Sequence, residues 1–171
     1  MNDKELPELV QGTCVLACRD FLKEELPDLA IEHPARYLSY LIERDLKDRE
    51  IDKGLSVHEE ASPFQCVRLS SAEGEPSFIV LGINMSRERT DQALSLLRSS
   101  KAKERVLLYL FSFESLADED LISQAMMEAE LLRMVRDTGI VAYFAMLDAR
   151  AGMGMLARID GDMRTIQYLP H

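Results

Sequence analysis

Nearly continuous apolar runs of strand length constrain the fold of this chain more than any other feature of its sequence. They cover residues 77–83, 105–113 and 140–147. Each run is far shorter than the 18 or more apolar residues that a membrane-spanning helix needs. An apolar run without polar alternation is typical of a central strand, and we expect residues 77–83 to occupy such a position.

Helical patterns fill the gaps between these runs. Ser86 is a suitable N-cap for a helix over residues 87–99. A second helix is predicted over residues 115–138, with Gly139 as the residue that ends it. Strand, helix and strand in succession form a crossover unit, so we predict parallel, right-handed β-α-β connections here.

The flanking segments add helices at one end and strands at the other. Apolar residues at helical spacing predict helices over 7–25 and 34–49, and residues 29–31 are expected to form a short extended piece. Strands over 55–60 and 64–69 should join 77–83 in an antiparallel meander, because the connections are short. Strands over 153–159 and 163–169 flank Asp160-Gly161, a strong hairpin signal.

Together these elements predict an α+β fold with a mixed sheet, in the order α-α-β-β-β-α-β-α-β-β-β. A length of 171 residues suits one domain over 1–171, with a helical part at 7–50 and a sheet-containing part at 55–171. The expected core positions in the central sheet are Val80, Ile83, Val106, Leu108, Leu110, Val141 and Tyr143, with Leu94, Leu97, Ile122 and Leu132 packed on the sheet.

Charge argues against a nucleic-acid partner. Lys and Arg number 20 against 30 Asp and Glu, which gives a net charge of −10. The densest basic stretches, at 44–53 and 101–105, are interleaved with acidic residues, whereas phosphate binding needs a basic stripe. The first 60 residues hold 15 acids and 8 bases and form an acidic pole. The acidic N-terminus lacks a secretory pattern, so we predict a cytoplasmic protein without a membrane partner.

Cysteine and histidine do not suggest a metal or cofactor site. Cys14, Cys18 and Cys66 are too few for a disulfide framework, and Cys14 and Cys18 share one face of the first helix. Two thiols do not complete the four ligands of a zinc site, and no histidine has helpful spacing. We therefore expect buried, reduced, structural cysteines and no cofactor.

The order of elements also resembles that of the acetyltransferase superfamily. The resemblance implies that the turn after the third strand, at 83–90, would hold the pyrophosphate of acyl-CoA, with Arg87 and Arg89 as its basic residues. Glu88 in the same turn would repel phosphate, and no glycine lies in the loop. An acyl-CoA-dependent enzyme or small-molecule sensor is thus the alternative function. The series also resembles ribonuclease H cores, but its carboxylates show no reason to converge.

Methionine is the compositional exception, because seven of the nine methionines lie after residue 125. Methionine side chains are flexible and polarisable, and they suit surfaces that accept varied apolar partners, although filling gaps in a core is their other use. The candidate partner-binding residues are Met127, Met134, Met153, Met155, Met163, Ile166 and Tyr168. The leading prediction is a non-catalytic protein-binding or regulatory domain, of adaptor, chaperone or immunity type. It is expected to bind a protein partner or a second copy through an acidic, Met-rich surface.

Overall fold

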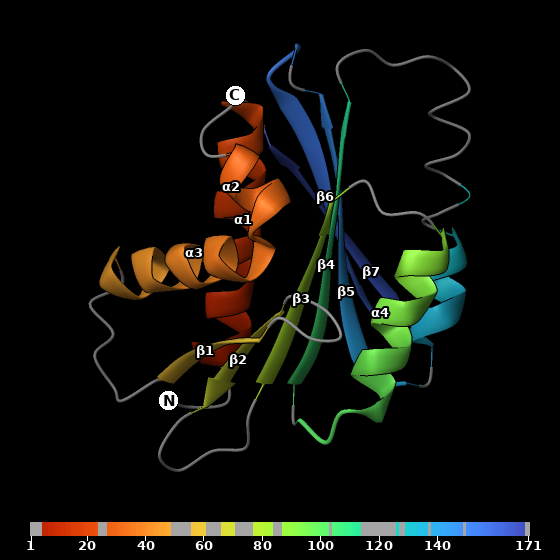
Figure 1. The fold of residues 1–171 in the computed structure, drawn as a ribbon. Coiled ribbons are helices and arrows are strands. Elements are labelled where there is room, and N and C mark those ends of the chain that lie inside the picture. The colour runs from red at the N-terminus through yellow and green to blue at the C-terminus, as the bar shows by residue number, and fades with distance from the viewer. Residues whose placement is uncertain are drawn as a thin grey trace.

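Seven strands form one mixed sheet, in the order in which they occur along the chain, in a computed structural model of the protein (Figure 1). The structure describes residues 5–23, 27–48, 56–60, 66–70, 77–83, 87–102, 104–113, 126, 129–136, 138–148 and 150–169. The strands are β1 (Ser56–Glu60), β2 (Cys66–Ser70), β3 (Ser77–Ile83), β4 (Glu104–Phe113), β5 (Ile140–Asp148), β6 (Met153–Asp160) and β7 (Met163–Leu169).

The strand directions confirm the predicted α+β fold with a mixed sheet. β1, β2 and β3 form the antiparallel meander, and β3, β4 and β5 are parallel to one another. β5, β6 and β7 are again antiparallel, and Gly161 begins the two-residue turn between β6 and β7 with a φ of 60°. A positive φ at that position is the reason for a glycine there, since L side chains are strained in this region.

The helices are α1 (Glu5–Leu22), α2 (Pro27–Glu32), α3 (Pro34–Asp48) and α4 (Arg87–Ser99), and residues 129–135 are also helical. The expectation of an extended piece at 29–31 is wrong, because these residues belong to α2. Pro27 suits the first helical position, Asp28 lies in the first turn, and the His33 N–H donates to the Leu29 carbonyl. The predicted helix at 115–138 is confirmed for 129–135, while residues 114–125 lie outside the described part.

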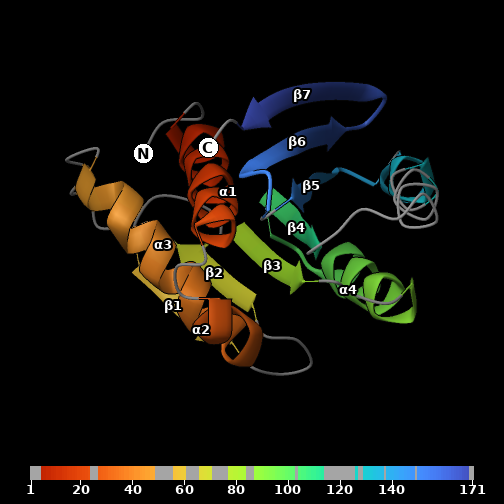
Figure 2. The same ribbon diagram turned by 90° about the horizontal axis from the view of Figure 1, so that it is seen from above.

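Helices cover both faces of the sheet (Figure 2). On the face that we call the α1–α3 face, Leu108, Tyr143 and Leu156 pack under α1 and α3. On the opposite face, the α4 face, Leu107 and Phe144 pack under α4 and the 129–135 helix. Successive strand residues therefore enter different cores, and this explains the continuous apolar runs of β4 and β5.

The predicted core positions are divided between these two cores. Val106, Leu108, Leu110 and Tyr143 are buried on the α1–α3 face, with Val141 packed against them. Leu94 and Leu97 are buried on the α4 face, where they pack on the sheet as expected. Leu132 is partly buried on the α4 face, the side chains of Val80 and Ile83 are not described, and Ile122 lies outside the described residues.

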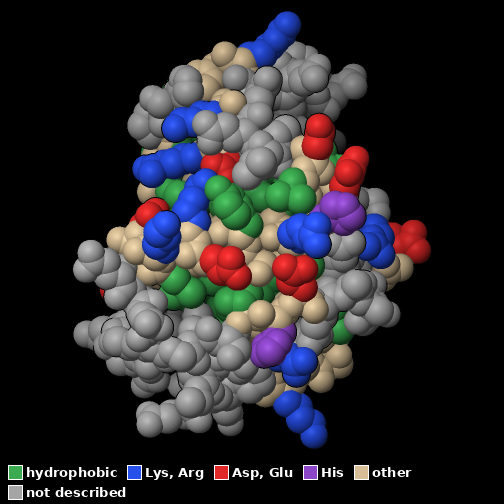
Figure 3. Space-filling view, turned by 60° about the vertical axis from the view of Figure 1, so that its left-hand side comes forward, with side chains coloured by type: hydrophobic (Ala, Val, Ile, Leu, Met, Phe, Trp, Pro, Cys, Tyr) green, Lys and Arg blue, Asp and Glu red, His purple; other side chains and the backbone are tan. Residues whose placement is uncertain are grey.

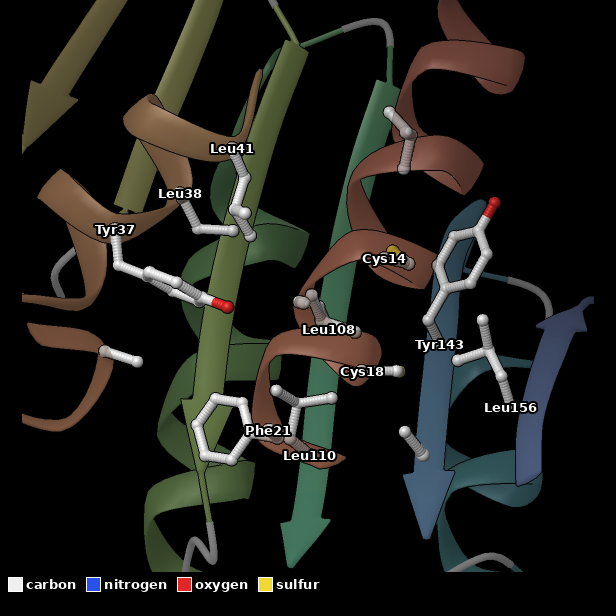
Figure 4. Close-up of a cluster of buried hydrophobic side chains, with 14 of the residues drawn as sticks. Cys14, Cys18, Phe21, Tyr37, Leu38, Leu41, Leu108, Leu110, Tyr143 and Leu156 are labelled. Atoms are coloured by element: carbon white, nitrogen blue, oxygen red, sulfur yellow. The ribbon is translucent and has the colours of Figure 1, made fainter. Parts of the chain in front are cut away.

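The three cysteines are free and buried, as expected. Cys14 and Cys18 lie on the side of α1 that faces β4 and β5, and Figure 4 shows them between Leu108 and Tyr143. Burial raises the pKa of the Cys14 thiol and raises that of Cys18 to about 12. Both groups therefore remain uncharged thiols at neutral pH, which is the form that an apolar core accepts.

A buried polar contact joins α1 to α3. The Tyr37 hydroxyl donates to Oδ2 of Asp20 at 3.1 Å, and the Arg44 guanidinium donates to Oδ1 of Asp20 at 3.3 Å. Asp20 is almost completely buried, so these two donors replace the water that its carboxylate loses on folding. Burial and the neighbouring Asp20 carboxylate both raise the pKa of Tyr37, which keeps the hydroxyl protonated as the donor.

Candidate protein-binding surface

Exposed apolar side chains are concentrated in the C-terminal hairpin of β6 and β7. Seven large hydrophobic side chains are exposed among the described residues, and four of them lie in this hairpin. The four are Met153, Met163, Ile166 and Tyr168. Tyr168 is 74% exposed and Ile166 is 41% exposed, although residues of these types usually lose most of their surface on folding.

Strand pairing sorts the predicted methionines and aromatic residues between the two faces. Met155 lies directly opposite Tyr168, and Ala157 lies directly opposite Ile166. Ala157 belongs to the core on the α4 face, so the side chains of Met153, Met155, Ile166 and Tyr168 share that face, because side chains alternate along a strand. We call these four residues the hairpin patch.

The other predicted site residues lie elsewhere. Met163 is opposite Asp160, on the α1–α3 face, although it is 70% exposed. Met134 is partly buried against the core on the α4 face, so it fills space there. Met127 lies outside the described residues. Met126 is 68% exposed and was not among the predicted residues.

The described helical segments on the α4 face, α4 and residues 129–135, pack over β6 but leave the β7 side chains exposed. Ala157 and Ile159 of β6 are fully buried beneath them. An ion pair between Arg136 and Asp162, at 3.0 Å, connects the end of the 129–135 helix to the hairpin turn. In the strand that follows this turn, every residue of β7 from Met163 to Tyr168 is exposed and only Leu169 is buried.

The two edges of the sheet differ in length and charge. β1 is the first edge, with five residues that include exposed His58 and Glu59. β7 is the second edge, with seven residues and Arg164 as its one charged residue. Figure 2 shows β7 as the outermost strand, and among the described strands it pairs with β6 alone. Short length and charge protect an edge strand from pairing, so β7 is the unprotected edge.

α1 packs on one face of the sheet and does not lie along its β7 edge. It crosses the α1–α3 face, where it contacts β4, β5 and β6. Its polar contact with β7 is a hydrogen bond from the Gln11 side-chain amide to the Gln167 side-chain carbonyl, at 3.1 Å. Gln167 faces this helix, so the bond occupies one face of β7 and leaves its free backbone edge uncovered by α1.

Charge on the helical side of the molecule is mixed. Figure 3 shows acidic and basic side chains next to one another on this side, with apolar side chains between them. Along α3, exposed Arg36 and Lys47 alternate with exposed Glu43 and Asp48. The described residues of this face therefore form neither the basic stripe of a nucleic-acid site nor a single acidic field.

Three observations on the described residues concern the catalytic and acyl-CoA alternatives. These residues contain no group of three or more His, Cys, Asp or Glu side chains that could hold a metal ion. β3 and β4 are paired from Ser77–Glu104 to Ile83–Leu110, so no ligand-sized gap opens between these strands. At the start of α4, Arg89 donates to Gln92 and Glu88 lies in the first turn. The acyl-CoA alternative remains a prediction, and residues 84–86 lie outside the described part.

Comparison with known proteins does not assign the chain to a family. No protein family matches it, and no curated protein has a significant match to it. Within the described residues, no helix is both long and apolar enough to cross a membrane.

Proposed function

We propose that the protein is a non-catalytic protein-binding domain of the cytoplasm, of adaptor, chaperone or immunity type. Its binding surface is the hairpin patch together with the free edge of β7. The observation that carries the proposal is the exposure of Tyr168 and Ile166 on a strand with one charged residue. Apolar side chains beside a free backbone edge are the combination used in strand addition, where the backbone provides affinity and the side chains provide specificity.

The composition of the patch supports a protein partner. Tyrosine is enriched in protein interfaces because its ring gives a large contact area and its hydroxyl keeps a polar contact. Met153 and Met155 provide side chains that can adapt to the shape of a partner. Arg164, next to them on β7, is exposed and can form charged or stacking contacts at the rim.

Photo-crosslinking tests this surface in cells. The photoreactive amino acid p-benzoylphenylalanine is placed at Tyr168, and a matched variant carries it at Tyr40, which is 42% exposed on α3. We expect protein adducts from position 168 and not from position 40. Excess purified wild-type protein should suppress the adduct in lysate, whereas the purified double variant Ile166→Asp/Tyr168→Asp should not. Equal adducts from both positions, or equal competition by the double variant, would contradict the proposal.

A thermal-shift experiment separates the proposal from the acyl-CoA alternative. A ligand that binds the folded state raises the melting temperature by mass action. We expect no change with acetyl-CoA at concentrations up to the millimolar range. A saturable increase that Arg87→Ala and Arg89→Ala abolish would instead favour the enzyme or sensor.

A further inference from the structure

We propose that the partner of β7 is the β7 strand of a second copy of this chain, paired antiparallel about a two-fold axis that passes beside Ile166. The inference rests on the proposed function, because it assigns an occupant and a register to the same surface. It joins two seven-stranded sheets into one continuous sheet across the dimer.

The geometry of antiparallel pairing limits the registers that are possible. When a strand pairs with its own copy about a two-fold axis perpendicular to the sheet, one residue lies opposite itself and its neighbours pair symmetrically. Ile166 is the midpoint of β7 (Met163–Leu169). Centring the pair on Ile166 therefore brings all seven residues of each strand into the ladder, and any other centre pairs fewer of them.

The side chains also favour this register. Ile166 lies opposite Ile166 of the second copy, and Arg164 lies opposite the second copy's Tyr168. An Arg guanidinium near a tyrosine ring is attracted to the ring face, so the one charge of β7 meets a suitable partner. A pair centred on Arg164 would place two like charges opposite each other, which is destabilising. The register centred on Ile166 therefore pairs the largest number of residues and also avoids placing like charges opposite each other.

The apolar surface becomes continuous across this interface. On the α4 face of each copy, Phe144 lies opposite Ala157, and Ala157 lies opposite Ile166. Contact between the two Ile166 side chains extends this row into the second copy without a polar interruption. The exposed isoleucine of the monomer becomes the centre of an apolar row, which is the part of an interface that contributes most to affinity.

Disulfide formation at single introduced cysteines measures the register directly. Directly opposed residues have Cβ atoms about 4.5–5.5 Å apart, near the range that a disulfide accepts. We expect Ile166→Cys to form a covalent dimer under mild oxidation with copper-phenanthroline. Gln167→Cys is the matched control, because its thiol faces Thr165 of the second copy and not itself. The wild-type chain controls for the native cysteines, which are buried.

A mixing experiment provides a second test that does not depend on the Ile166 variant. Thr165→Cys and Gln167→Cys chains, one of them carrying a mass tag, should form a mixed disulfide dimer when combined and little dimer when oxidised separately. In light scattering over a tenfold range of concentration, the wild-type mass should rise above 19.4 kDa, and Ile166→Lys should raise the dimer dissociation constant at least about tenfold.

The outcomes distinguish the inference from the proposed function. A constant mass near 19.4 kDa, or cross-linking at Gln167→Cys that equals cross-linking at Ile166→Cys, overturns the inference. If the photoreactive group at position 168 then captures a different protein, and the wild-type protein alone competes, the proposed function stands and only the second copy is excluded. If position 168 captures nothing above its control and the mass stays constant, both fail.

Discussion

Replacing Gly154 with alanine tests how closely β5, β6 and α1 approach one another. A Cβ atom at this position would lie 2.7 Å from Cδ2 of Leu147, 3.1 Å from the Met146 carbonyl oxygen and 3.7 Å from Cδ1 of Leu22. Carbon atoms in favourable contact are about 3.5–4.0 Å apart, so the first contact is a clash. Leu147 is fully buried, and the carbonyl belongs to the neighbouring strand, so neither has much freedom to move away.

The expected effect is a loss of about 1–2 kcal/mol in the free energy of unfolding. Overpacking of this kind costs about 1–3 kcal/mol, while alanine recovers about 0.4–1 kcal/mol by restricting the unfolded chain. Urea denaturation of Gly154→Ala should therefore show a lower midpoint with an unchanged slope.

A double-mutant cycle identifies the clash as the cause. Leu147→Val removes the atom that the new Cβ would meet, so the double variant should be less destabilised than the two single variants added together. Gly161→Ala is the control, because nothing lies within 4 Å of its Cβ and its cost comes from a φ of +60°. Leu147→Val should not relieve that cost. The close approach would be refuted if Gly154→Ala were as stable as the wild type, or if Leu147→Val gave it no relief.

Two further predictions concern pH and the ends of two helices. Burial raises the pKa of Cys18 to about 12, so its contribution to stability is complete below the unfolded thiol pKa of 9.0 and is lost as the pH rises toward 12. Between these pH values the free energy of unfolding should fall by about 1.4 kcal/mol per pH unit because of this thiol. In denaturant titrations, Cys18→Ala should lose less stability between pH 8 and 10.5 than the wild type does. Equal losses in the two proteins would contradict burial as the cause. Arg105 donates to the carbonyls of Thr138 and Leu97, each near the end of a helical segment. Arg105→Met should cost about 1–3 kcal/mol in thermal unfolding, with Arg105→Lys intermediate, and equal stability of all three proteins would show that these bonds contribute nothing.

Local patterns were sufficient to predict most elements of the fold. β3, α4 and β7 have the bounds that periodicity and turn residues indicate, because their signals lie within the elements themselves. α2 escaped prediction because six residues are too few to show a helical period. The division of the core between two faces was also missed. Which helix covers which face depends on contacts between distant segments, and no local pattern records them.

Only part of the candidate surface could be predicted, because the exposure of a side chain also depends on contacts between distant segments. Alternation along β7 could have separated Met163 from Ile166 and Tyr168, since odd and even residues of a strand face opposite ways. Exposure could not be read in the same manner, because it depends on how segments from elsewhere in the chain pack on each strand. The apolar side chains of β6 and β7 look alike in sequence, yet Ile159 is fully buried and Ile166 is exposed.

The packing of α1 on strands from the far end of the chain affects how the protein can form during synthesis. Phe21 and Leu156 belong to one core, and the Gln11–Gln167 bond joins residues 156 positions apart. At ordinary translation rates of about 5–20 residues per second, the apolar side of α1 waits on the order of 10 s before β6 leaves the ribosome. α3 follows α1 closely in the chain and is the first of these partners within reach, through Tyr37, Arg44 and the carboxylate of Asp20. The contact between α1 and α3 can therefore shelter part of that surface in the nascent chain, before the sheet that finally covers it exists.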